Sequence, residues 1–337
     1  MGDPKRFGVH GGANPHTRNV LGIRRRVHSK IAYQQWHSLA RALIAHGTEV
    51  CVIQAHPQLP GLVYPANAGF LFPLVSDGPD RVLTLEKTFY LSHLLPTRAA
   101  EREVYRPFIR AMGYRTHDIQ ARFEGEADFF PAASLMLFTH GVIERQRFVP
   151  CFGIPPWKRI YGFRSETAAL NELRPIADGC PVLELELSLE AHYHGDTVLC
   201  SFGAEREFLL VYMAGLTMRS REHLREVFGN RLIELSEGDA ALYAANSFQI
   251  DDRGKFYLFM PEGISDELIN EIRTRSVEPV LVNVSEFLAK GGGSIKCMIL
   301  DLGPRDQQPS DPAAVAFRTE RSYEHMFPEE TASSNSS

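Results

Sequence analysis

The sequence lacks several features that mark common classes of protein. Its 337 residues contain no run of about eighteen apolar residues, so we expect no membrane-spanning helix. No apolar stretch follows the charged residues at the N-terminus, so we expect no secretory signal. The net charge of -5 gives no excess of basic residues, so we expect no nucleic-acid partner.

The cysteines lack the spacing of a metal or disulfide motif. There are five, an odd number, and none forms a CxxC pair, so the sequence predicts neither a disulfide framework nor a zinc cluster. This usage is typical of a reducing compartment, and we expect a cytoplasmic protein. No GxGxxG follows the first expected strand, so we expect no dinucleotide, and we expect no other cofactor and no metal.

Helix and strand patterns alternate along the chain. Five helical patterns are each followed by a turn and an apolar strand, with turns near residues 47, 113, 179, 229 and 276. The expected helices run from Ser29 to His46, from about Thr97 to Met112, from Ser165 to before Pro175, from Ser220 to Phe228, and from Ser265 to about Arg275. This repetition predicts a radial or stacked α/β array, with an open doubly wound sheet as the alternative. The polar composition of residues 304–337 predicts a mostly disordered tail.

Three segments carry groups suited to catalysis. Glycines 291–293 lead to a thiol at Cys297, which follows the cationic Lys296. His194 and Asp196 would share one face of a strand. An extended backbone would likewise put three carboxylates on one face beside phenylalanines, as in a cation pocket: Glu124, Glu126 and Asp128. The plain alternatives are a polar strand end for the histidine pair and a solvated loop edge for the acids.

In the order carboxylate, histidine, cysteine, these segments resemble the guanidino-group modifying enzyme superfamily, whose fold is the pentein α/β-propeller. The resemblance covers most of residues 10–302 and is strongest for the dimethylarginine dimethylaminohydrolase, arginine dihydrolase and amidinotransferase branch. Further segments that carry it are residues 14–16, 65–69 and 161–165. It implies five ββαβ modules around a pseudo-fivefold axis, in one catalytic domain over residues 1–303.

The resemblance also implies roles for individual residues. Cys297 corresponds to the nucleophile, His194 to the general acid/base, and Glu124 to the carboxylate that supports the histidine or the guanidinium. The implied substrate-binding residues are Asp196, Asp128, Asn67, Asn14 and Arg98, the last for a substrate carboxylate. The chain departs from the family pattern at Gly61, Pro65 and Gly195, and by an extra acid, Glu126.

These residues predict a cysteine-dependent hydrolase of the guanidino group of arginine or a close derivative, which acts through a covalent amidino-thioether on Cys297. Cleavage would fall on a C–N bond of a linear amidine. An amidinotransferase, in which an amine intercepts the same intermediate, is the alternative, and a non-catalytic binding scaffold is the third reading. The expected partner is a small guanidino molecule, and a homo-oligomer is compatible with the sequence.

Overall fold

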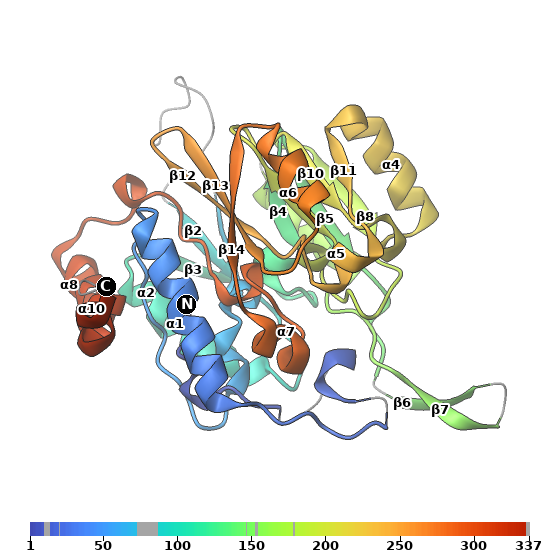
Figure 1. Ribbon diagram of the computed structural model, residues 1–337, viewed down its shortest axis with the longest axis horizontal. Helices are drawn as coiled ribbons and strands as arrows, with labels where there is room; N and C mark the ends of the chain where they lie inside the picture. The colour runs from blue at the N-terminus through green and yellow to red at the C-terminus, as the bar shows by residue number, and fades with distance from the viewer. Residues whose placement is uncertain are drawn as a thin grey trace.

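The computed structural model of the protein describes residues 1–9, 14–19, 21–72, 87–145, 147–151, 154–177 and 179–334. Over these residues the chain forms a mixed α/β structure of several small sheets with helices packed against them (Figure 1). The described strands form four three-stranded sheets and one two-stranded sheet, and no single open sheet. The doubly wound alternative therefore does not describe this chain.

The four three-stranded sheets share one topology. In each, the first strand pairs antiparallel with the second, and a helix then crosses over to a third strand parallel to the second. The first and second modules are β1 (Gly69–Phe72), β2 (Thr88–Leu91), α2 (Arg102–Ala111) and β3 (Arg115–Asp118), and then β4 (Phe129–Ala132), β5 (Leu135–His140), α3 (Leu170–Ile176) and β8 (Val182–Glu186). The third module is β9 (Leu199–Phe202), β10 (Phe208–Val211), α4 (Met218–Phe228) and β11 (Leu232–Glu234). The fourth module is β12 (Phe248–Asp252), β13 (Lys255–Pro261), α6 (Asp266–Arg273) and β14 (Val277–Val282). Four ββαβ units are thus present in the described residues.

Helical spacing explains why each crossover helix packs on its sheet. A parallel third strand needs a crossover connection, and a helix with apolar residues three or four positions apart buries one face against the sheet. The buried pairs are Tyr105 and Ile109, Leu170 and Leu173, Leu224 and Phe228, and Leu268 and Ile272. The helices expected at these four places are therefore confirmed, although their first residues differ.

The second module carries an insertion that the sequence patterns did not predict. Between β5 and α3 the chain forms an antiparallel hairpin of β6 (Arg147–Cys151) and β7 (Ile154–Ile160). The hairpin extends away from the rest of the chain (Figure 1). At its base, Glu190 Oε1 accepts hydrogen bonds from the backbone N–H groups of Tyr161 and Gly162, at 2.9 and 2.8 Å.

The first expected helix–strand unit is only half confirmed. Helix α1 (Ser29–Ala45) forms as expected, but residues 50–53 make only isolated bridges, from Ile53 to Gly2 and from Cys51 to Ser322. Two further helices, α5 (Glu237–Ala241) and α7 (Ser285–Gly291), are short. The sheets stay separate, so the five-bladed propeller is not confirmed beyond its mixed α/β content.

The disorder expected for residues 304–337 is wrong for most of that segment. Residues 312–334 form α8 (Pro312–Arg321), α9 (Tyr323–Met326) and α10 (Pro328–Ser334), while residues 335–337 lie outside the described part of the chain. Tyr323 is buried, and its hydroxyl lies 2.7 Å from Nδ1 of His37 in α1. The tail's few apolar side chains cover α1 and α2. The prediction of disorder used the composition of the whole segment, in which these few residues are outnumbered by polar ones. Whether residues 1–303 form a domain on their own stays a prediction.

Candidate active site

Short turns bring the predicted site residues together. Three 3₁₀ turns stand directly before or one residue before the first strand of a module, and a fourth carries the cysteine: η4 (Pro65–Ala68), η6 (Gly125–Ala127), η8 (Gly195–Thr197) and η11 (Lys296–Met298). The turn η4 contacts both η6 and η11, and η6 contacts η8. Gly125 allows this packing, because it has φ of +65° and a Cβ there would lie 2.6 Å from the carbonyl oxygen of Gly69.

These turns correct one expectation about the acidic segment. Residues 124–128 were expected to be extended with three carboxylates on one face, but the 3₁₀ turn changes their directions. Glu124 and Asp128 both reach His194, whereas Glu126 forms an ion pair with Lys296. Lys296, expected beside the thiol, thus directs its ammonium to a carboxylate.

His194 lies between two buried carboxylates. Its Nε2 is 3.2 Å from Glu124 Oε2, and its Nδ1 is 3.2 Å from Asp128 Oδ2. Burial alone would lower the pKa of His194, but Asp128 and Glu124 outweigh this effect and raise it to about 9. The imidazole is therefore protonated at neutral pH and can donate a proton.

Asp128 lies on the Nδ1 side of the ring and is saturated with donors. Thr139 Oγ1 and Ser165 Oγ each donate to it at 2.6 Å, and the N–H of Gly195 donates at 2.9 Å. Its side chain is 1% exposed. Asp128 was predicted to bind substrate, but in this arrangement its carboxylate has no lone pair left to accept from a ligand. The carboxylate instead fixes the orientation of His194.

Ser165 has a different role from the one expected. The third helix was expected to begin at this residue, but it begins at Leu170 after a 3₁₀ turn. The hydroxyl of Ser165 donates to Asp128 and accepts from the N–H of Glu124 at 3.1 Å. Its side chain therefore connects the Asp128 carboxylate to the backbone of Glu124.

Glu124 holds the other side of the ring. Burial would raise its pKa, but its hydrogen bond to His194 and the charges of His194 and Arg98 lower the pKa to about 2. Its Oε1 accepts from the N–H of Leu95 at 3.2 Å. Glu124 is thus an anion at all working pH values and stabilises the imidazolium.

Asp196 and Cys297 form the second half of the site. The thiol of Cys297 donates to Asp196 Oδ2 at 3.6 Å, and both side chains are buried. Asp196 Oδ1 is buried without a hydrogen-bond partner among the described residues. Burial raises the pKa of Asp196 to about 6, although His194 and Lys296 oppose the shift. A buried carboxylate oxygen that lacks a donor is suited to receive one from a ligand.

Burial and the neighbouring Asp196 raise the pKa of the Cys297 thiol well above its ordinary value. The thiol is therefore neutral when no ligand is present. A cation placed between Asp196 and Cys297 would oppose both effects and favour the thiolate.

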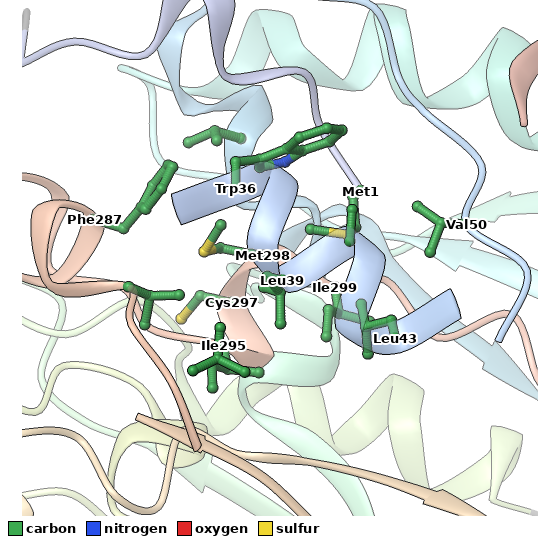
Figure 2. Close-up of a cluster of buried hydrophobic side chains, with 14 of the residues drawn as sticks. Met1, Trp36, Leu39, Leu43, Val50, Phe287, Ile295, Cys297, Met298 and Ile299 are labelled. Carbon is green, nitrogen blue, oxygen red and sulfur yellow. The ribbon is translucent and has the colours of Figure 1, made fainter. Parts of the chain in front are cut away.

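The turn that carries Cys297 sits on the apolar core. Cys297 belongs to a buried cluster with Ile295, Met298 and Ile299, which pack beneath α1 (Figure 2). The glycines before it allow close approach, because a Cβ at Gly293 would lie 2.5 Å from the Tyr64 ring and 3.0 Å from Cys297 Cβ. The prediction that these glycines allow the backbone to approach closely beside the thiol is consistent with this packing.

Asn246 is a site residue that was not predicted from the sequence. Its Oδ1 accepts from the N–H groups of Cys297 and Ser294 at 3.1 and 3.0 Å, and its Nδ2 donates to the carbonyl of Asp196 at 3.2 Å. It thereby ties the cysteine turn to the Asp196 turn. The signal was present, because residues 244–247 resemble residues 65–69, and Asn67 and Asn246 both stand two residues before the first strand of a module.

Asn67 and Arg98 lie beside His194. Asn67 Nδ2 is 3.3 Å from His194 Nε2, and Arg98 donates to Asn67 Oδ1 at 2.7 Å, which fixes the amide orientation. The remaining donors of Arg98 reach Glu101 and the carbonyls of Gly61 and Tyr64. In this arrangement Arg98 positions Asn67, and binding of a substrate carboxylate would require some of these bonds to be exchanged.

Asn14 lies beside the glycine segment and not beside the thiol. Its Nδ2 donates to the carbonyl of Gly291 at 2.8 Å and to the hydroxyl of Tyr193 at 3.1 Å. Tyr193, next to His194, donates in turn to the carbonyl of Gly292 at 2.6 Å. Asn14 therefore links the N-terminal segment to the turns of the site.

Two negative findings apply to the described residues. No group of three or more histidine, cysteine or acidic side chains there has an arrangement that could hold a metal ion. No helix in that part of the chain is long and apolar enough to cross a membrane.

Comparisons with known proteins find relatives among the dimethylarginine dimethylaminohydrolases. A family model described as "N,N dimethylarginine dimethylhydrolase, eukaryotic" matches residues 186–303. An N(G),N(G)-dimethylarginine dimethylaminohydrolase of Mycobacterium tuberculosis is 26% identical over 304 residues, which cover 90% of this chain and 85% of that protein.

Solved structures show the same fold. The N-terminal domain of ArgZ, a cyanobacterial arginine dihydrolase, superposes in its substrate-bound form with a TM-score of 0.72 at 21% identity, over 90% of this chain and 97% of that one. A complex of an AgrE variant with L-arginine gives 0.72 at 23% identity, over 92% of this chain and 41% of that one. A dimethylarginine dimethylaminohydrolase adduct with S-methyl-L-thiocitrulline gives 0.60 at 16% identity, over 84% and 92%.

These relatives are arginine-modifying enzymes of the pentein superfamily, so the resemblance predicted from the sequence is confirmed. The family model spans the segments that carry His194, Asp196 and Cys297. The identities are low, and the roles of individual residues therefore depend on the geometry described above.

Proposed function

We propose that the chain is a cysteine-dependent hydrolase of the guanidino group of arginine or a close derivative. The observation that carries the proposal is the buried Cys297–Asp196 contact beside a protonated His194, with one oxygen of Asp196 left without a partner in the part of the chain that the structure describes. The class, a hydrolase acting on C–N bonds of linear amidines, agrees with the names of the relatives.

Capture of the substrate begins with charge. A planar guanidinium offers parallel N–H donors, and a carboxylate can accept two of them. Asp196, whose Oδ1 has no donor among the described residues, would hold the cation against Cys297 Sγ. The cation then favours the thiolate, and the thiol proton leaves to solvent because His194 is already protonated.

The first chemical step forms a C–S bond. The Cys297 thiolate attacks the guanidinium carbon and gives a tetrahedral adduct. His194 donates its proton to the departing nitrogen, the C–N bond breaks, and an amidino-thioether remains on Cys297. Glu124 and Asp128 hold the ring in place for this transfer.

The second step returns the enzyme to its starting state. His194, now neutral, accepts a proton from water, and the hydroxide attacks the amidino carbon. The C–S bond breaks, the departing thiolate takes up the hydroxyl proton of the adduct, and a neutral ureido product is released with Cys297 again a thiol. General acid/base catalysis of this kind contributes about a hundredfold to ten-thousandfold.

Product analysis tests the proposal. The protein is incubated with arginine and with N-methylated arginines, and citrulline, ornithine, ammonia and methylamines are measured. We expect turnover of at least one compound and none by Cys297→Ser. Absence of product from every guanidino compound would refute the proposal. An arm with glycine, lysine or ornithine as acceptor tests the amidinotransferase alternative, for which a new guanidino product is required.

Two further proposals concern the fold and the location of the protein. We propose that residues before β1 and after Cys297 complete a fifth module beside the four ββαβ units, as in a five-bladed propeller. We also propose a cytoplasmic location, since Cys51, Cys200 and Cys297 are thiols and do not form disulfides.

A further inference from the structure

Glu126 binds both ends of the segment that holds Cys297. Its carboxylate pairs with the Lys296 ammonium, and it also accepts from the N–H of Asp301, at 3.2 Å through Oε1 and 3.3 Å through Oε2. Lys296 is the first residue of the cysteine turn, and Asp301 lies three residues after its end. One side chain from the β4 module thus fixes the two ends of the segment that presents the nucleophile.

The Lys296 ammonium is held at this place by several groups. It donates to the carbonyl of Ile299 at 3.4 Å and lies 5.7 Å from the centre of the Phe248 ring. The carboxylates of Glu126, Asp301 and Asp196 raise its pKa against the effect of burial. The side chains of Lys296 and Glu126 are 14% and 10% exposed, so the pair is largely removed from water.

A second contact fixes the same turn from another module. The carbonyl of Asn246 accepts from the N–H of Lys296 at 3.1 Å, and its side chain accepts from the N–H of Cys297. Asn246 precedes β12, whereas Glu126 precedes β4. The cysteine turn is therefore held from two sides, by an amide on one and by a carboxylate on the other.

A buried ion pair is a poor source of stability, because desolvation of both charges offsets most of their attraction. Removal of one partner is costly, however, because it leaves the other charge buried and unpaired. Such a pair therefore fixes geometry more than it adds stability.

We propose that Glu126 and Lys296 are positioning residues for the nucleophile. Their ion pair holds the turn Lys296–Met298 so that Cys297 Sγ faces the Asp196 carboxylate. Glu126, the extra acid of this chain, compensates the charge that Lys296 brings next to the thiol. The catalytic consequence depends on the proposed function, but the geometry of the thiol can be tested without any substrate.

Four variants test the pair: Glu126→Gln, Lys296→Gln, the double variant, and Lys296→Arg. The control is Glu278→Gln, which removes one carboxylate from an exposed pair with Arg273. For each protein we would measure the alkylation rate of Cys297 by iodoacetamide as a function of pH, with the site identified by mass spectrometry. Thermal unfolding and kcat and KM are measured alongside.

Glu126→Gln should lower kcat about a hundredfold with a smaller change in KM, as a displaced catalytic group does. Its unpaired ammonium should shift the alkylation profile of Cys297 to lower pH. The double variant should restore that profile but not kcat, because the clamp is still absent. Lys296→Arg, which keeps the ion pair, should retain most of the activity, and the control should match the parent protein.

Wild-type kcat and a wild-type alkylation profile in Glu126→Gln would overturn the proposal. So would equal losses in Lys296→Arg and Lys296→Gln, because the pair would then not be what matters. Should Glu126→Gln fail to fold, Lys296→Gln and Lys296→Arg decide by the same comparison. If the parent protein turns over no guanidino compound, the proposed function fails, whereas the alkylation profiles still decide the positioning role.

Discussion

Replacing Asp128 with asparagine separates two roles for this carboxylate. The sequence predicted that Asp128 binds substrate, which would make the change a defect in KM. The structure places it behind His194, where it accepts from Nδ1, Thr139, Ser165 and Gly195. We therefore expect a defect in kcat with little change in KM.

The size of the effect follows from the contacts. An asparagine oxygen can accept about two of the four donors, and its NH₂ faces the others. With the NH₂ facing Nδ1, the amide donates to the ring, so His194 would become neutral with its proton on Nε2. A comparable carboxylate-to-amide change behind a catalytic histidine costs about ten-thousandfold in kcat. Unsatisfied buried groups cost about 1–3 kcal/mol each, so we expect a loss of about 2–4 kcal/mol of unfolding free energy.

Steady-state kinetics and urea denaturation measure these effects. Asp118→Asn is the matched control, because Asp118 pairs with Arg106 on the surface, away from the site. A large rise in KM with kcat preserved would refute the reasoning, because Asp128 would then contact the substrate. An unchanged kcat would refute it as well.

Three further predictions follow from the same structure. Asp196→Asn should raise KM about 10- to 100-fold, the equivalent of about 1.5–3 kcal/mol for a charged hydrogen bond, while the protein still folds; an unfolded variant would mean that Asp196 is structural. The profile of kcat/KM against pH should be a bell, since activity falls as Asp196 is protonated below about 6 and as His194 loses its proton above about 9; a profile that is flat across this range would contradict the assignment of both groups. Tyr323→Ala should lower the unfolding free energy by about 3–5 kcal/mol, because a buried ring over α1 is lost. Phe148→Ala, at an exposed position, is the control and should change the unfolding free energy little. Equal stabilities of the two variants by urea denaturation would show that the C-terminal helices do not support the fold.

Periodicity was enough to place most helices but not the site geometry. The pair Leu268 and Ile272, with Ser265 as a cap, gives a helix by local rules, and α6 forms there. The segment from Glu124 to Asp128 obeys no such rule, because its turn depends on packing against the backbone of Gly69. That contact joins residues far apart in sequence, and it turns Glu126 away from its two neighbours.

The site residues also divide into those that the sequence pattern predicts and those that only the folded structure reveals. Cys297, His194 and Glu124 were predicted in the order in which they occur, and the structure brings their turns together. Asn246 was missed because its partners, the backbone groups around Cys297, become visible only after folding. The tail was misjudged because a few apolar residues among many polar ones pack α8 and α9 onto the core: Phe317, Tyr323, Met326 and Phe327.

A trapped adduct on Cys297 tests the central claim most directly. His194→Gly removes the proton donor, and S-methyl-L-thiocitrulline carries a thiolate leaving group that departs without one. The intact mass of this variant, after incubation with that compound, should increase by one amidino adduct located on Cys297, and the adduct should be absent when Cys297 is also changed to serine. An unmodified thiol alongside continuing turnover of guanidino substrates by Cys297→Ser would contradict the account.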